Sequence, residues 1–259
     1  MKNLLLFLLA CSLGAAAAAR PIRGSVKCGG KPMGGVTVTD GYTFAQSDEQ
    51  GIFTLDADDQ ALFISLVTPS GYLAPLDGGI PQFYRTYDPA AKRYDFELQP
   101  WPGSGECYEL LAIADPQPKT EEHFRRLRSE VMPALQAATD NGRTRGANQA
   151  AIVLGDIVWD SPELFAGVKA EFAKLGVPVY GVIGNHDHEF PQVTDLSAQR
   201  RYEASFGPVN YSFTRGDVHF VSMDDIIHKA TGSDAYTSGF LDWQFEWLKQ
   251  DLSYVPRTC

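Results

Sequence analysis

Three apolar stretches of this 259-residue chain each end in side chains that bind divalent cations. Asp115 and Gln117 follow the first stretch, Asp156 follows the second, and Asn185 and His186 follow the third. Carboxylate, amide and imidazole groups carry the oxygen and nitrogen donors that hard or borderline divalent metals prefer. The residue types therefore predict a metal site, provided that the fold brings the three stretches together.

The three stretches are predicted strands, and the segments between them are predicted helices. The strands span residues 107–115, 149–156 and 177–185. A β-α-β-α-β order is typical of a parallel sheet that is covered by helices. Because the carboxyl ends of parallel strands meet at one crevice, we expect the polar side chains that follow these strands to converge there.

Two amphipathic helices are predicted to connect the strands. The first spans residues 120–139, with Thr120 as its N-cap and an apolar face formed by Phe124, Leu127, Val131, Leu135 and Ala138. The second spans residues 161–176, with Ser161 as its N-cap, Pro162 in the first turn and Gly176 at the end. Beyond the third strand, residues 211–225 predict a β-hairpin. The chain ends on a helix in which Trp243 and Trp247 are expected to pack against the protein.

The N-terminal third of the chain has a different pattern. Residues 22–98 contain short alternating strands that are separated by glycine-containing turns, which is typical of a small β-sandwich. A Pro- and Gly-rich segment follows. We therefore predict an all-β sandwich domain over residues 20–100, a linker over 101–106 and an α/β domain over 107–259.

The first 19 residues are typical of a secretory signal peptide. Lys2 precedes an apolar run, and the alanines that follow supply an A-x-A cleavage site. The apolar run is too short to span a membrane. The sequence "LLAC" leaves a lipoprotein alternative open, in which Cys11 carries a lipid anchor. Both alternatives predict a protein exported to the bacterial periplasm or surface, without a transmembrane span.

Charge and cysteine content narrow the function classes further. The formal net charge of −10 disfavours a nucleic-acid partner, because affinity for phosphate backbones needs a concentrated basic surface. Export permits disulfide bonds, and a Cys28–Cys107 pair is one alternative. Buried free cysteines are the other, because the cysteines that remain after signal removal are odd in number.

The strand-end residues form an ordered series that resembles the calcineurin-like metallophosphoesterases. The series reads "IADPQ", "LGDIVWD" and "VIGNHD", and the resemblance covers roughly residues 107–225. The N-terminal pattern "GVTVTDG…SDEQGIFTL" is similar to the Ig-like or prealbumin-like module that precedes some bacterial members of the family. The resemblance implies an exported enzyme that hydrolyses a phosphate mono- or diester of a small molecule or a glycan.

The resemblance also assigns metal ligands. It implies two divalent ions (Mn, Fe, Zn or Mg), with Asp115 and Gln117 on the first, Asn185 on the second, and Asp156 bridging both. Two cations about 3.5–4 Å apart would neutralise the ester oxygens and lower the pKa of a shared water, which then attacks as hydroxide. Gln117 stands where many members have histidine, and its neutral oxygen favours Mn, Mg or Fe.

The catalytic roles implied by the resemblance fall on the third strand end. His186 would contact the phosphate and protonate the leaving oxygen, a step that suits a histidine near neutral pH. Asp187 would orient the His186 imidazole. Asp160 is expected either to contact these site residues or only to mark the entry of a helix. His188 is expected either to contact the substrate or to lie in a solvated loop.

Three further histidines that complete the metal site in this family have no counterpart here. His219 lies within an apolar strand and is predicted to be hydrogen-bonded in a sheet, whereas His228 is predicted to lie in a loop, where it faces solvent or, alternatively, reaches the cleft. We therefore expect the missing ligands beyond Cys259, and we expect the 259 residues alone to be inactive, with one edge or face of the sheet exposed. The alternative is a non-catalytic surface or glycan-binding protein that retains the fold with a degraded metal site.

Overall fold

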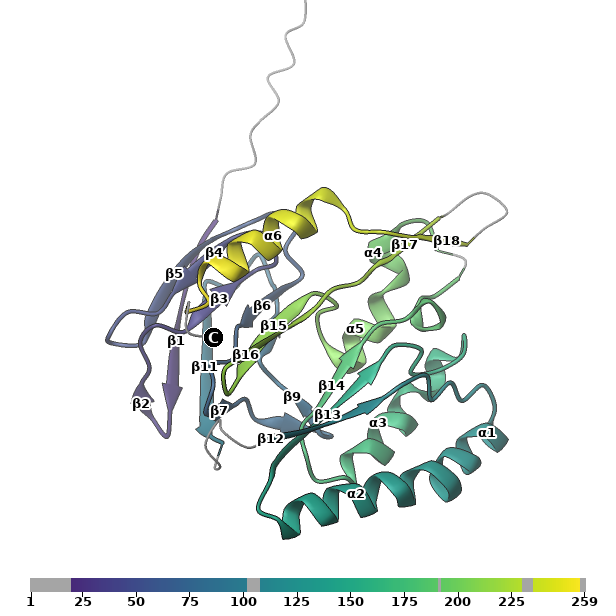
Figure 1. The fold of residues 1–259 in the computed structure, drawn as a ribbon. Coiled ribbons are helices and arrows are strands. Elements are labelled where there is room, and N and C mark those ends of the chain that lie inside the picture. Colours follow the sequence, from purple (N-terminus) through teal and green to yellow (C-terminus); the bar gives the residue numbers. More distant parts are fainter. Residues whose placement is uncertain (1–19, 102–107, 191, 230–234, 257–259) are drawn as a thin grey trace, which may run out of the picture.

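The computed structural model describes residues 20–101, 108–190, 192–229 and 235–256. The predicted signal peptide with Cys11 lies outside the described residues, as does Cys107, so the Cys28–Cys107 pairing stays a prediction. Figure 1 shows a strand-rich N-terminal region beside a region in which helices and strands alternate. Within the described residues, no helix is long and apolar enough to cross a membrane.

The N-terminal region consists of short strands in two larger sheets and a separate two-stranded pair, β8 with β9. The strands are β1 (Arg20–Cys28), β2 (Lys31–Pro32), β3 (Thr37–Thr39), β4 (Phe44–Gln46), β5 (Ile52–Ala57), β6 (Phe63–Leu66), β7 (Tyr72–Leu73), β8 (Leu76–Asp77), β9 (Ile80–Pro81), β10 (Tyr84–Thr86) and β11 (Arg93–Pro100). One sheet has the order β2-β1-β11-β7, with β5 also paired to β1, and the other has the order β10-β6-β3-β4. Strand β11 alternates buried and exposed residues, so Tyr94, Phe96 and Leu98 point into the apolar core of the N-terminal strands.

The second region begins with the β-α-β-α-β series that the sequence predicts. Its elements are β12 (Tyr108–Ile113), α1 (Glu121–Arg126), a π-helical turn (Leu127–Val131), α2 (Met132–Thr144), β13 (Asn148–Leu154), a 3₁₀ turn (Pro162–Leu164), α3 (Phe165–Ala173) and β14 (Val179–Val182). It continues with a 3₁₀ turn (Asn185–Asp187), α4 (Asp195–Ala198), α5 (Arg200–Phe206), β15 (Tyr211–Arg215), β16 (Val218–Ser222), β17 (Ile226–His228), β18 (Tyr236–Ser238) and α6 (Asp242–Ser253).

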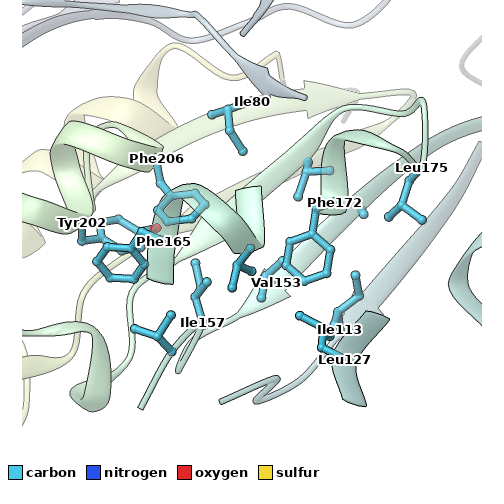
Figure 2. Close-up of a cluster of buried hydrophobic side chains, with 14 of the residues drawn as sticks. Ile80, Ile113, Leu127, Val153, Ile157, Phe165, Phe172, Leu175, Tyr202 and Phe206 are labelled. Carbon is cyan, nitrogen blue, oxygen red and sulfur yellow. The ribbon is translucent and has the colours of Figure 1, made fainter. Parts of the chain in front are cut away.

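The first three strands of this region form a parallel sheet, as predicted, and their order is β12-β13-β14. Most of strand β13 is buried on both faces, because Ala151 and Val153 belong to one apolar core and Ala150 to the other. The first core lies against α1 and α3 and is shown in Figure 2. On the opposite face, which carries Ala150, the side chains of Leu110 and Leu154 are exposed.

The N-terminal and α/β regions share their apolar cores. Ile80 of β9 packs into the core between the parallel sheet and its helices, and Figure 2 shows it at the upper side of this cluster, above Phe206. In the other direction, Tyr180 and Phe213 join the core of the N-terminal strands. The two regions predicted as separate domains are therefore packed as neighbours with continuous apolar contact.

The predicted helix over residues 120–139 exists, but its buried face differs from the prediction. Thr120 caps it as expected, since its hydroxyl accepts a hydrogen bond from the His123 N–H. The π-helical turn then adds a residue to the backbone, which rotates the following helix relative to α1. Val131 and Ala138 are consequently exposed, while Met132 and Thr139 are buried.

Ser161 occupies the predicted N-cap position of the next helical segment, and Pro162 lies in its first turn, but the capping contact is different. Ser161 makes no capping hydrogen bond. Its hydroxyl donates instead to the backbone oxygens of Lys119 and Trp159, at 3.2 and 2.9 Å. Ser161 therefore fastens the loop after β12 to the loop after β13. The α-helix ends at Ala173, earlier than predicted, and Gly176 lies in the turn that follows with a left-handed φ of 67° that favours glycine.

The last helix packs against the N-terminal sheet, as Figure 1 shows for α6 and β4. Trp247 is 1% exposed and its ring lies 6.4 Å from Phe44, which confirms that it is a packing residue. Trp243 lies 5.3 Å from Tyr42, measured between ring centroids. Both predicted packing roles are thus filled, and the partner rings come from the N-terminal region.

Glu203 of α5 is a buried carboxyl group that makes stability depend on pH. It is 7% exposed, and burial raises its pKa to about 7, while Arg200 acts to lower the pKa and Asp224 to raise it. The folded protein therefore holds this proton more tightly than the unfolded chain does. The contribution to stability is complete below the unfolded pKa and is lost as the pH rises through the folded pKa.

We expect Glu203→Gln to abolish this pH-dependent loss of stability, because glutamine does not titrate. A pKa shift of this size corresponds to about 3 kcal/mol in the free energy of unfolding. The free energy of unfolding from urea titrations at about pH 5 and about pH 8 measures it. Glu246→Gln, on an exposed face of α6, is the matched control. The same pH dependence in wild type and Glu203→Gln would contradict the assignment.

Candidate metal centre

The three predicted ligand segments lie at one edge of the parallel sheet. Ile113 pairs with Val153, and Val153 pairs with Gly181, so the strands end nearly level with one another. Asp115 follows β12, Asp156 follows β13, and the 3₁₀ turn that contains Asn185 follows β14. The convergence expected from the order of strands and helices is therefore present in the fold.

Asp156 is the residue that joins the three segments. Its carboxylate is mostly buried, with 8% of the residue exposed. Oδ2 accepts a hydrogen bond from Nε2 of Gln117 at 2.6 Å, and Oδ1 accepts one from the His186 N–H at 3.0 Å. The Gln117 N–H also donates to the Asp156 backbone oxygen at 3.1 Å. One carboxylate thus holds a predicted metal ligand and the predicted acid in place.

The backbone at this edge is held in a left-handed conformation. Among the described residues, four that are not glycine have a positive φ: Asp115 (44°), Gln117 (41°), Asp156 (46°) and Asp160 (48°). Each such residue costs on the order of 1–3 kcal/mol and persists only where surrounding contacts enforce it. All four lie in the loops that follow β12 and β13, so the strain is concentrated where the candidate ligands gather.

Gly184 allows the third loop to approach Asp156. A Cβ atom at position 184 would collide with both the backbone nitrogen and the carboxylate of Asp156. Gly155, which has a φ of 81°, lies on the other side of the same contact. The two glycines let the loops after β13 and β14 pack backbone to backbone, which brings His186 within hydrogen-bonding distance of Asp156.

The His186 imidazole is partly exposed and is held on two sides. Its Nδ1 lies 2.9 Å from Oδ1 of Asp160, and the Asp160 N–H donates to the His186 backbone oxygen at 3.0 Å. The indole of Trp159 stacks on the ring, with 4.3 Å between centroids and 25° between planes. The Lys119 ammonium group lies 5.1 Å from the Trp159 ring centroid. The histidine ring therefore has a fixed orientation.

The prediction that Asp187 orients His186 is corrected by these contacts, because Asp160 takes that position. Asp187 is 1% exposed, and its carboxylate accepts hydrogen bonds from the N–H groups of Ile157, Val158 and Gly184. Burial raises its pKa to about 7, although these three hydrogen bonds act to lower it. The 3₁₀ turn directs the Asp187 side chain back into the loop after β13, where it ties two loops together.

His188 is not in a solvated loop. Its side chain has no exposed surface, its Nδ1 lies 2.9 Å from the Gly184 oxygen, and its Nε2 lies 3.4 Å from Oδ2 of Asp224. Burial alone would lower the pKa of His188, but the Asp224 carboxylate raises it above the usual value. A side chain so enclosed does not reach a substrate in this conformation, and it supports the loop from behind.

Comparison with known families identifies the region that contains these contacts. Residues 108–252 match the family described as calcineurin-like phosphoesterase, and this match covers more than half of the chain. The chain belongs to the calcineurin-like phosphoesterase family. Residues 20–101 match the segment described as the N terminal of calcineurin-like phosphoesterase. No curated protein and no solved structure matches the chain.

In this calcineurin-like phosphoesterase His219 and His228 are bonded to residues outside the candidate metal centre. His219 lies in β16, with Nε2 2.7 Å from Asp251 and Nδ1 2.9 Å from the Thr214 hydroxyl, which agrees with the prediction of a histidine bonded within the sheet. The solvent-facing position predicted for His228 is wrong. His228 is 8% exposed, because β17 pairs with β18 and the His228 N–H donates to Asp195 of α4.

The donor set can be compared with the divalent metals that this family typically uses. Asp115, Gln117, Asp156 and Asn185 offer two carboxylates and two amide oxygens, a set that fits a hard cation such as Mg²⁺ or Mn²⁺. A flip of the Gln117 side-chain amide would exchange its oxygen and its nitrogen. The amide oxygen would then occupy the place beside the Asp156 carboxylate that Nε2 occupies here. Within the described ranges, no three His, Cys, Asp or Glu side chains form a group that could hold a metal by themselves.

Trp159 is a site residue that was not predicted from the sequence. It lies in the segment "GDIVWD", directly before Asp160, and is partly exposed. An aromatic residue between two carboxylates of one motif was the available signal. Its role became visible only when the loops after β13 and β14 were placed together.

Proposed function

We propose that this protein is an exported, metal-dependent phosphoesterase that hydrolyses a phosphate mono- or diester. One observation carries the proposal: the buried Asp156 carboxylate bonds to Gln117 and to the His186 backbone, at the carboxyl edge of the parallel sheet. The family match supports the same class of reaction. In this proposal Asp115, Gln117, Asp156 and Asn185 hold two divalent ions, with Mn²⁺, Mg²⁺ or Fe²⁺ favoured over Zn²⁺.

The metal ions, when bound, would supply positive charge that offsets the anionic ester and activates water. The chain's own residues supply orientation and a proton. The Asp160 carboxylate engages Nδ1 of His186, so Nε2 is the ring nitrogen available to hold the proton that passes to the leaving oxygen. Stacking on Trp159 restricts rotation of the ring and gives the substrate a flat apolar wall.

The proposed location and substrate rest on the sequence. A signal peptide over residues 1–19 would carry the protein to the periplasm or outside the cell, with a lipid anchor at Cys11 as the alternative. The two N-terminal sheets around one core support a β-sandwich domain. The substrate would be a phosphorylated small molecule or a glycan, since the acidic net charge repels long polyanions.

A second candidate function is a non-catalytic surface or glycan-binding protein. The observation that favours it is the amide-rich donor set, which lacks a third carboxylate or histidine within the described residues. Such a site would retain the loop geometry and bind metal weakly. The two candidates differ in whether metal addition produces hydrolysis.

The deciding experiment uses the full-length protein after EDTA treatment. We expect hydrolysis of p-nitrophenyl phosphate or of bis-p-nitrophenyl phosphate to be absent without metal and restored by Mn²⁺ or Mg²⁺, with Zn²⁺ less effective. The ratio of the two rates assigns the ester class. Failure of Mn²⁺, Mg²⁺, Fe²⁺ and Zn²⁺ to restore hydrolysis of either ester would reject the enzyme and favour the binding protein.

A further inference from the structure

A cavity of about 280 Å³ lies between the N-terminal strands and the α/β region. One side is formed by the segments around Tyr42 and Leu62, and the other by α5, the segment around Val209 and the start of α6. The residues that line it include neither the candidate metal ligands nor His186. The cavity is therefore separate from the metal centre.

Much of the cavity wall is apolar and aromatic. Leu62 and Phe63 contribute from the N-terminal region, and Val209 and Trp243 contribute from the α/β region. Tyr42 and Trp243 bring their rings within 5.3 Å of each other, one from each region. Walls of this kind enclose the body of a small organic ligand and leave its orientation to a few polar groups.

Glu203 is a buried carboxyl group in the cavity wall. It lines the cavity and is more than nine-tenths buried, yet within the described residues its carboxyl group has no hydrogen bond or ion pair. A buried carboxylate without a partner is costly, so a ligand that pairs with it gains the energy of relieving that cost.

The other carboxylates that line the cavity are already engaged. Asp40 accepts hydrogen bonds from the N–H groups of Tyr42, Thr43 and Asp58. Asp195 and Asp224 both accept from the Gln199 amide, at 3.3 and 2.6 Å. Among the described lining residues there is no lysine or arginine. The cavity is therefore electronegative, and Glu203 is the carboxyl group left to bind a ligand.

We propose that this cavity binds a small organic cation, with an ammonium group on Glu203 and an apolar body against Tyr42 and Trp243. The ammonium group donates hydrogen bonds to the Glu203 carboxylate and pairs with its negative charge. The two aromatic rings add apolar contact with the body of the ligand. Because the walls come from both regions, the bound cation also stabilises their packing by mass action. Binding of a cation in this cavity does not depend on the phosphoesterase reaction.

Calorimetric titration of the full-length protein with 2-phenylethylammonium tests the proposal, with 2-phenylethanol as its neutral counterpart. We expect a Kd for the ammonium compound below about 1 mM, and binding of the alcohol at least about tenfold weaker. Glu203→Gln should abolish that preference, while Glu246→Gln should keep it. Glu203→Gln is expected to fold, because it removes an unpaired buried charge.

Two further measurements keep the result interpretable. Trp243→Leu retains Glu203 and should weaken binding of the ammonium compound at least about threefold. Excess EDTA should leave ammonium binding unchanged, which separates this cavity from the metal centre. The proposal is overturned if the ammonium compound does not bind, if the alcohol binds equally well, if Glu203→Gln keeps the preference, or if EDTA abolishes binding.

Discussion

His186→Ala is expected to lower kcat about 10²–10⁴-fold for esters with poor leaving groups, such as phenyl phosphate, the range associated with loss of a general acid. Phenolate leaves poorly without a proton, and the ring fixed by Asp160 and Trp159 is placed to deliver one. p-Nitrophenolate is stable as an anion, so the loss with p-nitrophenyl esters should be much smaller. Steady-state rates on the two esters, measured at saturating metal, give the comparison.

The difference between leaving groups distinguishes proton transfer from a structural role. The metal content and thermal midpoint of His186→Ala should match the wild type, because the ring contributes neither a predicted metal ligand nor a core side chain. Equal losses for phenyl and p-nitrophenyl esters would remove His186 from proton transfer. In that case its contribution would lie in binding the phosphate.

Asp156→Asn is expected to remove bound metal and to lower kcat/KM by about 10³-fold or more. The carboxylate accepts hydrogen bonds from Gln117 and His186 at the position where the three loops meet. An amide there lacks the negative charge, and its NH₂ group would face a donor. Elemental analysis for metal content and ester hydrolysis measure the effect.

Asp225→Asn is the matched control for this substitution, because Asp225 is an exposed carboxylate after a strand of the same region. It should retain both metal and activity. An Asp156→Asn variant that binds metal and hydrolyses ester like the wild type would show that the bridging assignment is incorrect.

The sheet and its strand-end residues were predictable from the sequence. Apolar runs such as "AAIVLG" have few alternatives to a buried strand, and alternation with helices fixes parallel order. The buried face of the helix over residues 120–139 was less predictable. Because of the π-helical turn (Leu127–Val131), Met132 is buried in place of Val131. The pattern of apolar residues does not reveal such a turn.

Roles within the site depended on the direction of side chains, which the sequence does not specify. Asp187 is adjacent to His186 in the chain, but the 3₁₀ turn sends its carboxylate toward Ile157, while Asp160 approaches the imidazole across the loop contact. The burial of His188 and His228 depends on partners from distant segments, Asp224 and Asp195. Contacts of this kind follow from tertiary packing.

The most direct test of the account is to locate metal in crystals of the full-length protein grown with Mn²⁺, using anomalous scattering. We predict a peak bound by the Asp156 carboxylate, with Asp115, Gln117 and Asn185 among the residues around the metal positions. Crystals of active protein that show no Mn²⁺ at Asp156, or show it bound only by other residues, would contradict the proposed metal centre.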